Sequence, residues 1–86
     1  MAHVPLEELQ RRLQEARTKI EEGSQYTHYK SPDKPYIIKG FGILEASEEV
    51  AVIYENQAGV AFIRPLSEFL DIVTHENRQV PRFSKV

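Results

Sequence analysis

Hydrophobic residues in the first quarter of the chain recur with a helical period. Between Pro5 and Gly23 they follow one another at spacings of three and four, which places them on one stripe of an α-helix. Pro5 suits the first helical position, and Gly23 suits the position just after the last turn. We therefore predict an amphipathic helix over residues 6–22 of an N-terminal segment 1–23, and its apolar stripe comprises Leu6, Leu9, Leu13, Ala16 and Ile20.

This leucine-rich stripe has two interpretations. A small domain needs its apolar residues for its own core, which favours packing of the stripe against the rest of the chain. Alternatively, two copies pair as a coiled coil, although the stripe is short for a stable one. The protein is then a monomer or a weak homodimer, in which the paired residues are Leu6, Leu9, Leu13 and Ile20.

After Gly23 the hydrophobic period changes from a helical one to alternation, and β-branched and aromatic residues become frequent. "SPDKP" reads as a turn with two prolines, and Gly40 and Gly42 indicate a bulge or bend inside a strand. "PLSEFL" is long enough for one helical turn, and a further turn is expected around Glu76 to Arg78. The expected strands lie near Gln25–Lys30, Tyr36–Leu44, Val50–Glu55, Val60–Arg64 and Asp71–Thr74.

This order of elements predicts an α+β, mostly β, fold. We expect residues 24–86 to form an SH3-like small β-barrel of about five short strands, with a short helical turn before the last strand. A chain of 86 residues has room for one hydrophobic core.

Composition excludes several classes of protein. The formal net charge of −2 does not suit a general nucleic-acid binder, although it leaves room for a local basic patch. The absence of cysteine excludes disulfides and thiolate metal sites. We expect neither a signal peptide nor a membrane span, because no run approaches about 20 apolar residues. The expected location is the cytoplasm, without a membrane partner.

Five motifs in a fixed order resemble the bacterial domain-of-unknown-function family 1653 (DUF1653) over about residues 23–83. They are "YTHYK", "PYIIKGFGILEASEE", "VAVIYE", "FIRPLSEFLDIV" and "VPRF". Phe62 replaces the tryptophan that the family usually has, and the loops "EASEE" and Asn77–Arg78 also depart from its pattern. The resemblance implies no activity, because the family has no established one. It does mark recurrent positions, which here are Tyr26, His28, Tyr29, Lys30, Tyr36, Tyr54, Arg64, Pro65, Leu66, Phe69, Pro81, Arg82 and Phe83.

The first motif also supplies candidate binding residues. In an extended strand Tyr26, His28 and Lys30 share one face, and Tyr29 lies on the other. Because lysine is rarely buried without a partner, we expect the face with Lys30 to be wet and Tyr29 to point to the core. Aromatic rings with arginine or lysine suit a phosphate or carboxylate ligand. The predicted binding face is Tyr26, His28, Lys30, Tyr54, Arg64 and Arg82.

A plainer interpretation of the same residues is structural. The tyrosines would cover the core, His28 would make one backbone hydrogen bond, and Arg64 would pair with a strand neighbour such as Glu55. Both interpretations stay open at the level of the sequence.

Catalytic and metal chemistry find little support. The three histidines lack the spacing of metal ligands, and no serine lies in a nucleophile elbow. We therefore expect no metal, no cofactor and no catalytic residue. The hypothesis is a non-enzymatic binding module for a protein segment, a nucleotide or an RNA element. Two alternatives are an enzyme with His28 as acid or base, and a structural subunit that dimerises through its N-terminal helix.

Overall fold

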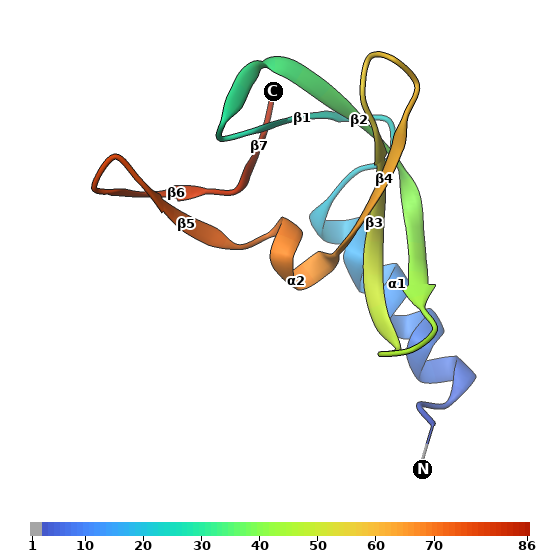
Figure 1. Ribbon diagram of the computed structural model, residues 1–86. Helices are drawn as coiled ribbons and strands as arrows, with labels where there is room; N and C mark the ends of the chain where they lie inside the picture. Colours follow the sequence, from blue (N-terminus) through green and yellow to red (C-terminus); the bar gives the residue numbers. More distant parts are fainter. Residues whose placement is uncertain (1–2) are drawn as a thin grey trace.

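The computed structural model describes residues 3–86 and shows a mostly β fold with two helices and seven strands (Figure 1). The mostly β composition and the N-terminal helix agree with the prediction. The elements in chain order are α1 (Leu6–Lys19), β1 (Gln25–His28), β2 (Ser31–Leu44), β3 (Glu49–Glu55), β4 (Ala61–Pro65), α2 (Leu66–Phe69), β5 (Ile72–His75), β6 (Arg78–Pro81) and β7 (Phe83–Lys85).

Five of the strands form one antiparallel sheet in the order β4-β3-β2-β1-β7, and β5 and β6 form a separate hairpin. Strands β4 and β7 are the two edges of an open sheet, so the closed SH3-like barrel that we expected is not confirmed. Two more strands exist than we expected, β6 and β7, and they follow the turn expected around Glu76 to Arg78, which is confirmed at Glu76 and Asn77. Both residues have positive φ, 52° and 63°, as a tight two-residue hairpin turn requires.

The first hairpin turn lies earlier than predicted. Residue His28 pairs with Ser31, so the turn is Tyr29–Lys30, and the prediction of a turn at "SPDKP" was wrong. The Lys30 N–H donates to His28 Nδ1 at 3.2 Å, which closes the turn locally. Pro32 and Pro35 instead lie in β2, where no residue between Ser31 and Tyr36 has a partner in the register. Their missing N–H groups therefore cost no ladder bond.

Strand β2 is long enough, at 14 residues, to pair with both β1 and β3. It bends at a bulge: Ile38 pairs with Tyr54 and Gly40 pairs with Ile53, which leaves Lys39 as the extra residue. The predicted irregularity is confirmed at Gly40. It was wrong at Gly42, which pairs regularly with Ala51.

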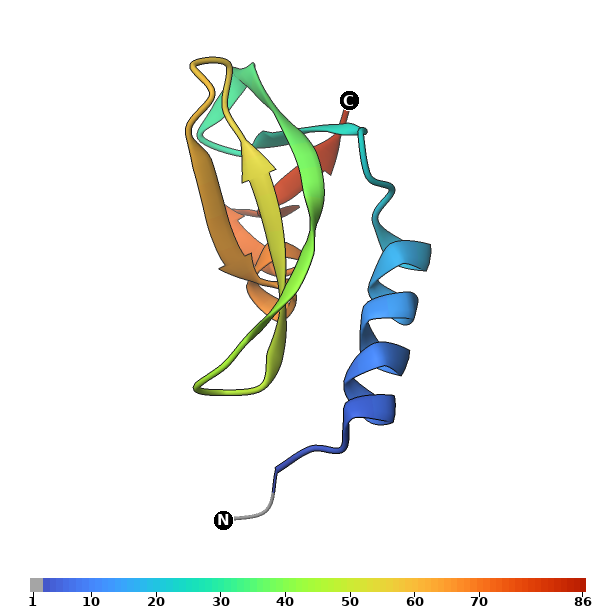
Figure 2. The ribbon, with the colours of Figure 1, turned by 90° about the vertical axis from the view of Figure 1, so that its right-hand side faces the viewer.

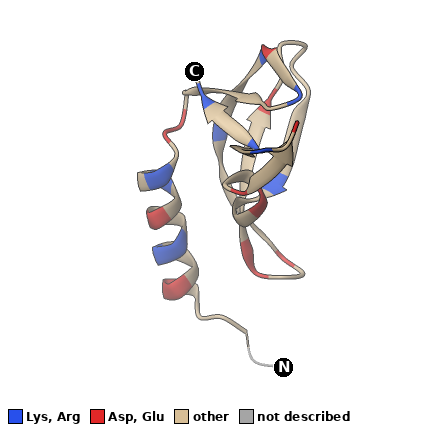
Figure 3. Ribbon diagram, turned by 90° about the vertical axis from the view of Figure 1, so that its left-hand side faces the viewer, with Lys and Arg blue, Asp and Glu red and all other residues tan. Residues whose placement is uncertain are grey.

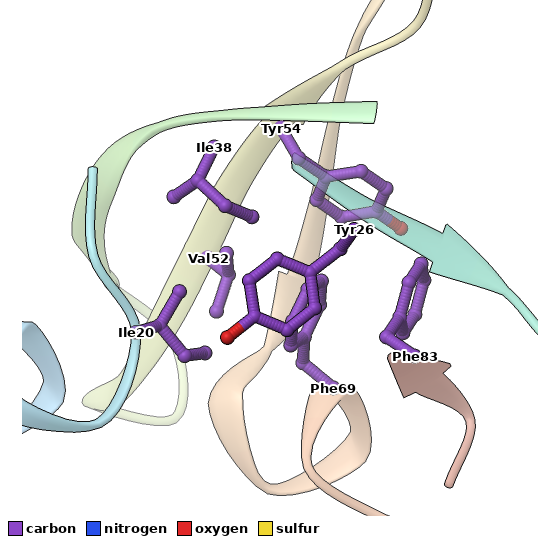
Figure 4. Close-up of a cluster of buried hydrophobic side chains, with 7 residues drawn as sticks. All are labelled: Ile20, Tyr26, Ile38, Val52, Tyr54, Phe69 and Phe83. Carbon is purple, nitrogen blue, oxygen red and sulfur yellow. The ribbon is translucent and has the colours of Figure 1, made fainter. Parts of the chain in front are cut away.

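The core gathers side chains from helices and strands that are far apart in the sequence (Figure 4). The rings of Phe69 and Phe83 stack with their centroids 4.1 Å apart, and Tyr26 packs edge-on against Phe69 at 5.4 Å. Helix α2 is thereby held against the sheet. The buried cluster comprises Ile20, Tyr26, Ile38, Val52, Tyr54, Phe69 and Phe83.

Helix α1 lies beside the sheet (Figure 2) and contacts β2 and β3. The end of its apolar stripe is buried, at Ala16 and Ile20, whereas Leu6 is 67% exposed. The helix ends at Lys19, three residues earlier than predicted, because Ile20 is already extended, and Pro5 is its N-cap rather than its first helical residue. Among residues 3–86, no helix has the length and apolar character needed to cross a bilayer.

Acidic and basic residues alternate along α1 (Figure 3). Arg11 forms ion pairs with Glu8 and Glu15, and Arg12 pairs with Glu8 at 3.1 Å. The hydrogen bond from Arg11 is the largest cause that lowers the pKa of Glu8, to about 2. These pairs form a solvated face of the helix, opposite the stripe that packs on the sheet.

Candidate functional site

His28 is the last residue of β1 and lies half-buried at the margin of the core. Its ring packs edge-on against Phe83, with centroids 5.0 Å apart, and lies 4.6 Å from the ring of Tyr29. Because its Nδ1 accepts the Lys30 N–H, the neutral ring carries its proton on Nε2. The expected backbone bond of His28 is confirmed, and it shapes the turn that presents Lys30.

Three cationic side chains surround His28 from three parts of the chain. Arg64 comes from β4, Arg82 lies between β6 and β7, and Lys30 follows β1. Burial lowers the pKa of His28, and the positive charges of Arg64, Arg82 and Lys30 lower it further. The imidazole is therefore neutral near pH 7, in a surrounding of positive potential.

Arg64 is held by neighbours on three sides. Its Nε donates to the Tyr54 hydroxyl at 3.2 Å, and its guanidinium carbon lies 5.6 Å from the centroid of the Phe83 ring. One terminal nitrogen lies 3.4 Å from Glu68, four residues on in α2. The expected pairing of Arg64 with Glu55 was wrong, because the register aligns Arg64 with Val52 and the chain enters α2 directly after Pro65.

Arg82 is fixed through its backbone. Its N–H donates to the Asp71 carbonyl at 2.8 Å, and its own carbonyl accepts the Tyr29 N–H at 3.0 Å. The side chain reaches Asp71 at a long 3.7 Å, and its Nε is buried without a hydrogen-bond partner. A buried guanidinium N–H without an acceptor is unfavourable, and because Nε is buried, a ligand meets only the exposed 24% of the Arg82 side chain.

An aromatic surface adjoins Arg64. The rings of Tyr54 and Phe62 stack at 5.8 Å, and Tyr36 meets both edge-on, at 5.3 Å and 6.0 Å. Phe62 and Arg64 lie two apart on β4 and therefore share a face, and Phe62 is 40% exposed. The sequence prediction omitted Tyr36 and Phe62. The alternation that joins Phe62 to Arg64 was the signal for Phe62, and the signal for Tyr36 was its place among the recurrent positions of the family.

The structure brings five of the six predicted residues together. Contacts link them: His28 and Arg64 both pack on the Phe83 ring, which Arg82 precedes in the chain. The Lys30 N–H donates to His28, and the Tyr54 hydroxyl accepts from Arg64. We call these five residues the cationic face. They approach one another because β1 pairs with β7, which places His28 opposite Phe83 and beside Arg82.

Tyr26 does not belong to the cationic face. It is 9% exposed and lies in the core against Phe69, so its expected solvent exposure was wrong. That expectation assumed that Lys30 and Tyr26 share a face of one strand. Lys30 lies in the turn after β1, so its exposure says nothing about the side of the sheet on which Tyr26 lies. Tyr29, which we expected in the core, is outside the buried cluster and packs on His28 and His75.

One hollow of the described residues lies apart from the cationic face. It is an open groove of about 820 Å³ between α1 and the β2–β3 hairpin, where Glu48 accepts the Val4 N–H at 3.1 Å. No residue of the cationic face lines it, so we do not place the site there. Over residues 3–86, no three histidine or acidic side chains gather as metal ligands. The groove is lined by His3, Leu9, Ile43, Glu45, Ala46, Ser47 and Glu48.

Comparison with known proteins gives one match. A family model described as "Protein of unknown function (DUF1653)" matches residues 24–85. No curated protein and no solved structure matches the chain. The matched range includes every residue of the cationic face and leaves out α1, as the sequence motifs had indicated.

Proposed function

This chain belongs to the DUF1653 family, whose description states no function, and we propose that it is a non-enzymatic binding module for an anionic group. The group is a phosphate or a carboxylate carried by a larger ligand, and the cationic face receives it. The observation that carries this proposal is that Arg64 and His28 both pack on the Phe83 ring, while Arg82 directly precedes Phe83 and its carbonyl accepts the Tyr29 N–H.

The charges at the cationic face are incompletely paired. Glu68 lies 3.4 Å from Arg64 and Asp71 lies 3.7 Å from Arg82, and both acids are more than half exposed. Exposed pairs of this kind contribute about 0–1 kcal/mol and exchange readily for a better acceptor. An anion that accepts from the terminal nitrogens of Arg64 and Arg82, whose side chains are partly exposed, supplies charge-assisted hydrogen bonds in place of these long pairs.

The aromatic surface suits the rest of such a ligand. Phe62 offers an exposed ring face beside Arg64, and Tyr36 and Tyr54 hold that ring in place from behind. An apolar or planar part of a ligand gains from contact with this ring while its anionic end meets the arginines.

The two alternative functions gain no specific support. One ring nitrogen of His28 is engaged in the turn, and a single histidine does not make an acid–base pair. The buried part of the α1 stripe packs on its own sheet, which leaves Leu6 as its main exposed apolar residue. Both alternatives remain hypotheses, whereas the cationic face has a geometry that favours binding.

Nuclear magnetic resonance titration tests the proposal. Inorganic phosphate, glutamate and adenosine monophosphate are added in turn, while the His28 ring and the arginine side-chain N–H signals are observed. A bound anion stabilises the imidazolium, so the pKa of His28 should rise with ligand. Sodium chloride at equal ionic strength controls for screening.

Matched variants make this test specific. Arg82→Gln and Arg64→Gln should each weaken the response of His28 by about tenfold or more in ligand concentration. Arg17→Gln is the control, because Arg17 is an exposed arginine that pairs with Glu22 on the helical side of the molecule. If none of the three anions moves His28 beyond the sodium chloride control, the proposed function is wrong.

A further inference from the structure

Strand β4 is an uncovered edge of the five-stranded sheet. It ends the order β4-β3-β2-β1-β7, and no strand of residues 3–86 pairs with its outer side (Figure 2). Edge strands present free N–H and C=O groups to any extended chain that approaches. This edge strand contains Arg64 of the cationic face and Phe62 of the aromatic surface beside it.

The register shows which groups of β4 face outward. The Asn56 N–H donates to the Val60 carbonyl at 3.0 Å, so Val60 directs its main-chain groups toward β3. Alternation then turns those of Phe62 and Arg64 inward and those of Ala61 and Ile63 outward. Pro65, which has no N–H, falls at an outward position, so β3 loses no bond there.

Side chains along β4 protect this edge only at its end, where Arg64 is charged and Pro65 lacks an N–H. Ile63 is 63% exposed, as is Val60 just before the strand at 50%, and the strand contains neither a lysine nor a bulge. The other edge, β7, has three residues and carries Lys85, which lies 3.7 Å from Glu21. Strand β4 is therefore the edge that is open to pairing.

We propose that β4 binds an extended acidic peptide of a partner protein, which adds a strand to the sheet. The inference rests on the proposed function, since Arg64 supplies the charge that a carboxylate of the peptide meets. Ala61 and Ile63 supply the main-chain hydrogen bonds, which are the usual source of affinity in strand addition. Charge complementarity at Arg64 selects an acidic segment over other extended chains.

Side-chain alternation fixes the pattern of the ligand. Peptide residues opposite Phe62 and Arg64 lie on their face of the sheet, and the residue between them lies beside Ile63 on the other face. An acidic side chain thus belongs opposite Arg64, and an apolar, β-branched one belongs opposite Ile63. The ligand alternates acidic and apolar residues.

A peptide suits these observations better than a single-stranded RNA. RNA makes no use of the outward main-chain groups of Ala61 and Ile63, and it needs several exposed rings for stacking. Here Tyr54 and Phe83 are buried and Phe62 alone of the three is open.

The experiment uses a blocked hexapeptide of alternating glutamate and valine, added to the full chain. We expect amide hydrogen exchange at Ala61 and Ile63 to slow by about tenfold or more at saturation. The inward amides of Phe62 and Arg64 should change little, since they are already bonded to β3. A glutamine–valine peptide controls for charge, and a peptide with a central proline controls for strand pairing.

Two variants place the contact. Ile63→Pro removes an outward N–H but no bond to β3, as prolines on edge strands do, so it should abolish binding in a folded protein. Arg64→Gln should weaken binding of the glutamate peptide to that of the glutamine peptide. Thermal unfolding verifies that each variant is folded. If Ile63→Pro does not fold, the test rests on whether the peptide protects the Ala61 and Ile63 amides of the unmodified chain.

The outcomes separate the two proposals. If the peptide has no effect but phosphate or a six-nucleotide oligouridylate still shifts His28, strand addition is overturned and anion binding stands. If neither peptide nor anion acts, both proposals are wrong. Binding of the peptide without protection of Ala61 and Ile63 would also overturn the placement at β4.

Discussion

His28 illustrates how one residue reports on its surroundings. Burial and three cations lower its pKa below the ordinary value of about 6.5. The unfolded chain therefore binds a proton at a higher pH than the folded chain does. His28 contributes fully to stability above about pH 6.5, and this contribution is lost as the pH falls through its pKa in the folded protein.

The first prediction concerns this pH dependence. His28→Asn keeps a side-chain acceptor for the Lys30 N–H, as in an Asx turn, but removes the titrating ring. The free energy of unfolding of the original protein should fall more steeply than that of the variant as the pH falls below about 6.5. Urea unfolding at a series of pH values measures both. Parallel curves would show that His28 is not desolvated in the fold.

The second prediction concerns Tyr26. Its ring lies in the core against Phe69, and it is absent from the cationic face. Tyr26→Ala should cost about 3 kcal/mol or more in the free energy of unfolding, because it leaves a cavity. Tyr26→Phe should cost less than about 1.5 kcal/mol and should leave the response of His28 to phosphate unchanged. A loss of that response in the folded Tyr26→Phe variant would show that Tyr26 takes part in anion binding, contrary to this prediction.

At the scale of the element, the two ends of the apolar stripe of α1 differ in burial. Ile20, just past the helix, is 1% exposed and contacts the core, whereas Leu6 in the first turn is 67% exposed. The sequence pattern treats both residues alike. Their difference arises because the sheet of β2 and β3 covers the end of the stripe at Ala16 and Ile20 and leaves Leu6 open.

The third prediction compares these two ends. Ile20→Ala should destabilise the protein by about 2–5 kcal/mol, and Leu6→Ala should change the free energy of unfolding by about 0.5 kcal/mol or less. Chemical unfolding provides the first comparison. Sedimentation over about a hundredfold dilution range tests for a dimer through the stripe. Such a dimer would dissociate on dilution, so the measured mass would fall, and Leu6→Ala would weaken it.

At the scale of the molecule, one core unites α1, α2 and the sheet. Ile20 follows α1, Phe69 ends α2 and Phe83 begins β7, and all three lie in the same buried cluster. No element has a second core of its own among the buried residues of the described chain. Unfolding of one part therefore exposes the others.

The fourth prediction follows from this shared core. Far-ultraviolet circular dichroism, which reports on helix, and near-ultraviolet tyrosine signals, which report on packing, should give coincident thermal transitions. Ile20→Ala should lower both midpoints together. An earlier helical transition would mean that α1 unfolds independently of the sheet.

The sequence by itself determined the periodic features of this protein. Helix α1, the positions of most strands, the bulge at Gly40 and the shared face of Phe62 and Arg64 depend on local spacing, which the sequence carries directly. The tertiary structure decided the rest. Alternation says which residues share a face, but pairing with β7 decided that the Tyr26 face of β1 is the buried one.

The same limit explains why the sequence alone did not predict how the residues of the cationic face come together. Lys30, Arg64 and Arg82 are brought to His28 by a two-residue turn, a strand register and a connection between β6 and β7. The open edge of β4 likewise exists only as a position in the strand order. These features depend on hydrogen bonds between residues far apart in the chain, and a local pattern does not encode which partners those residues find.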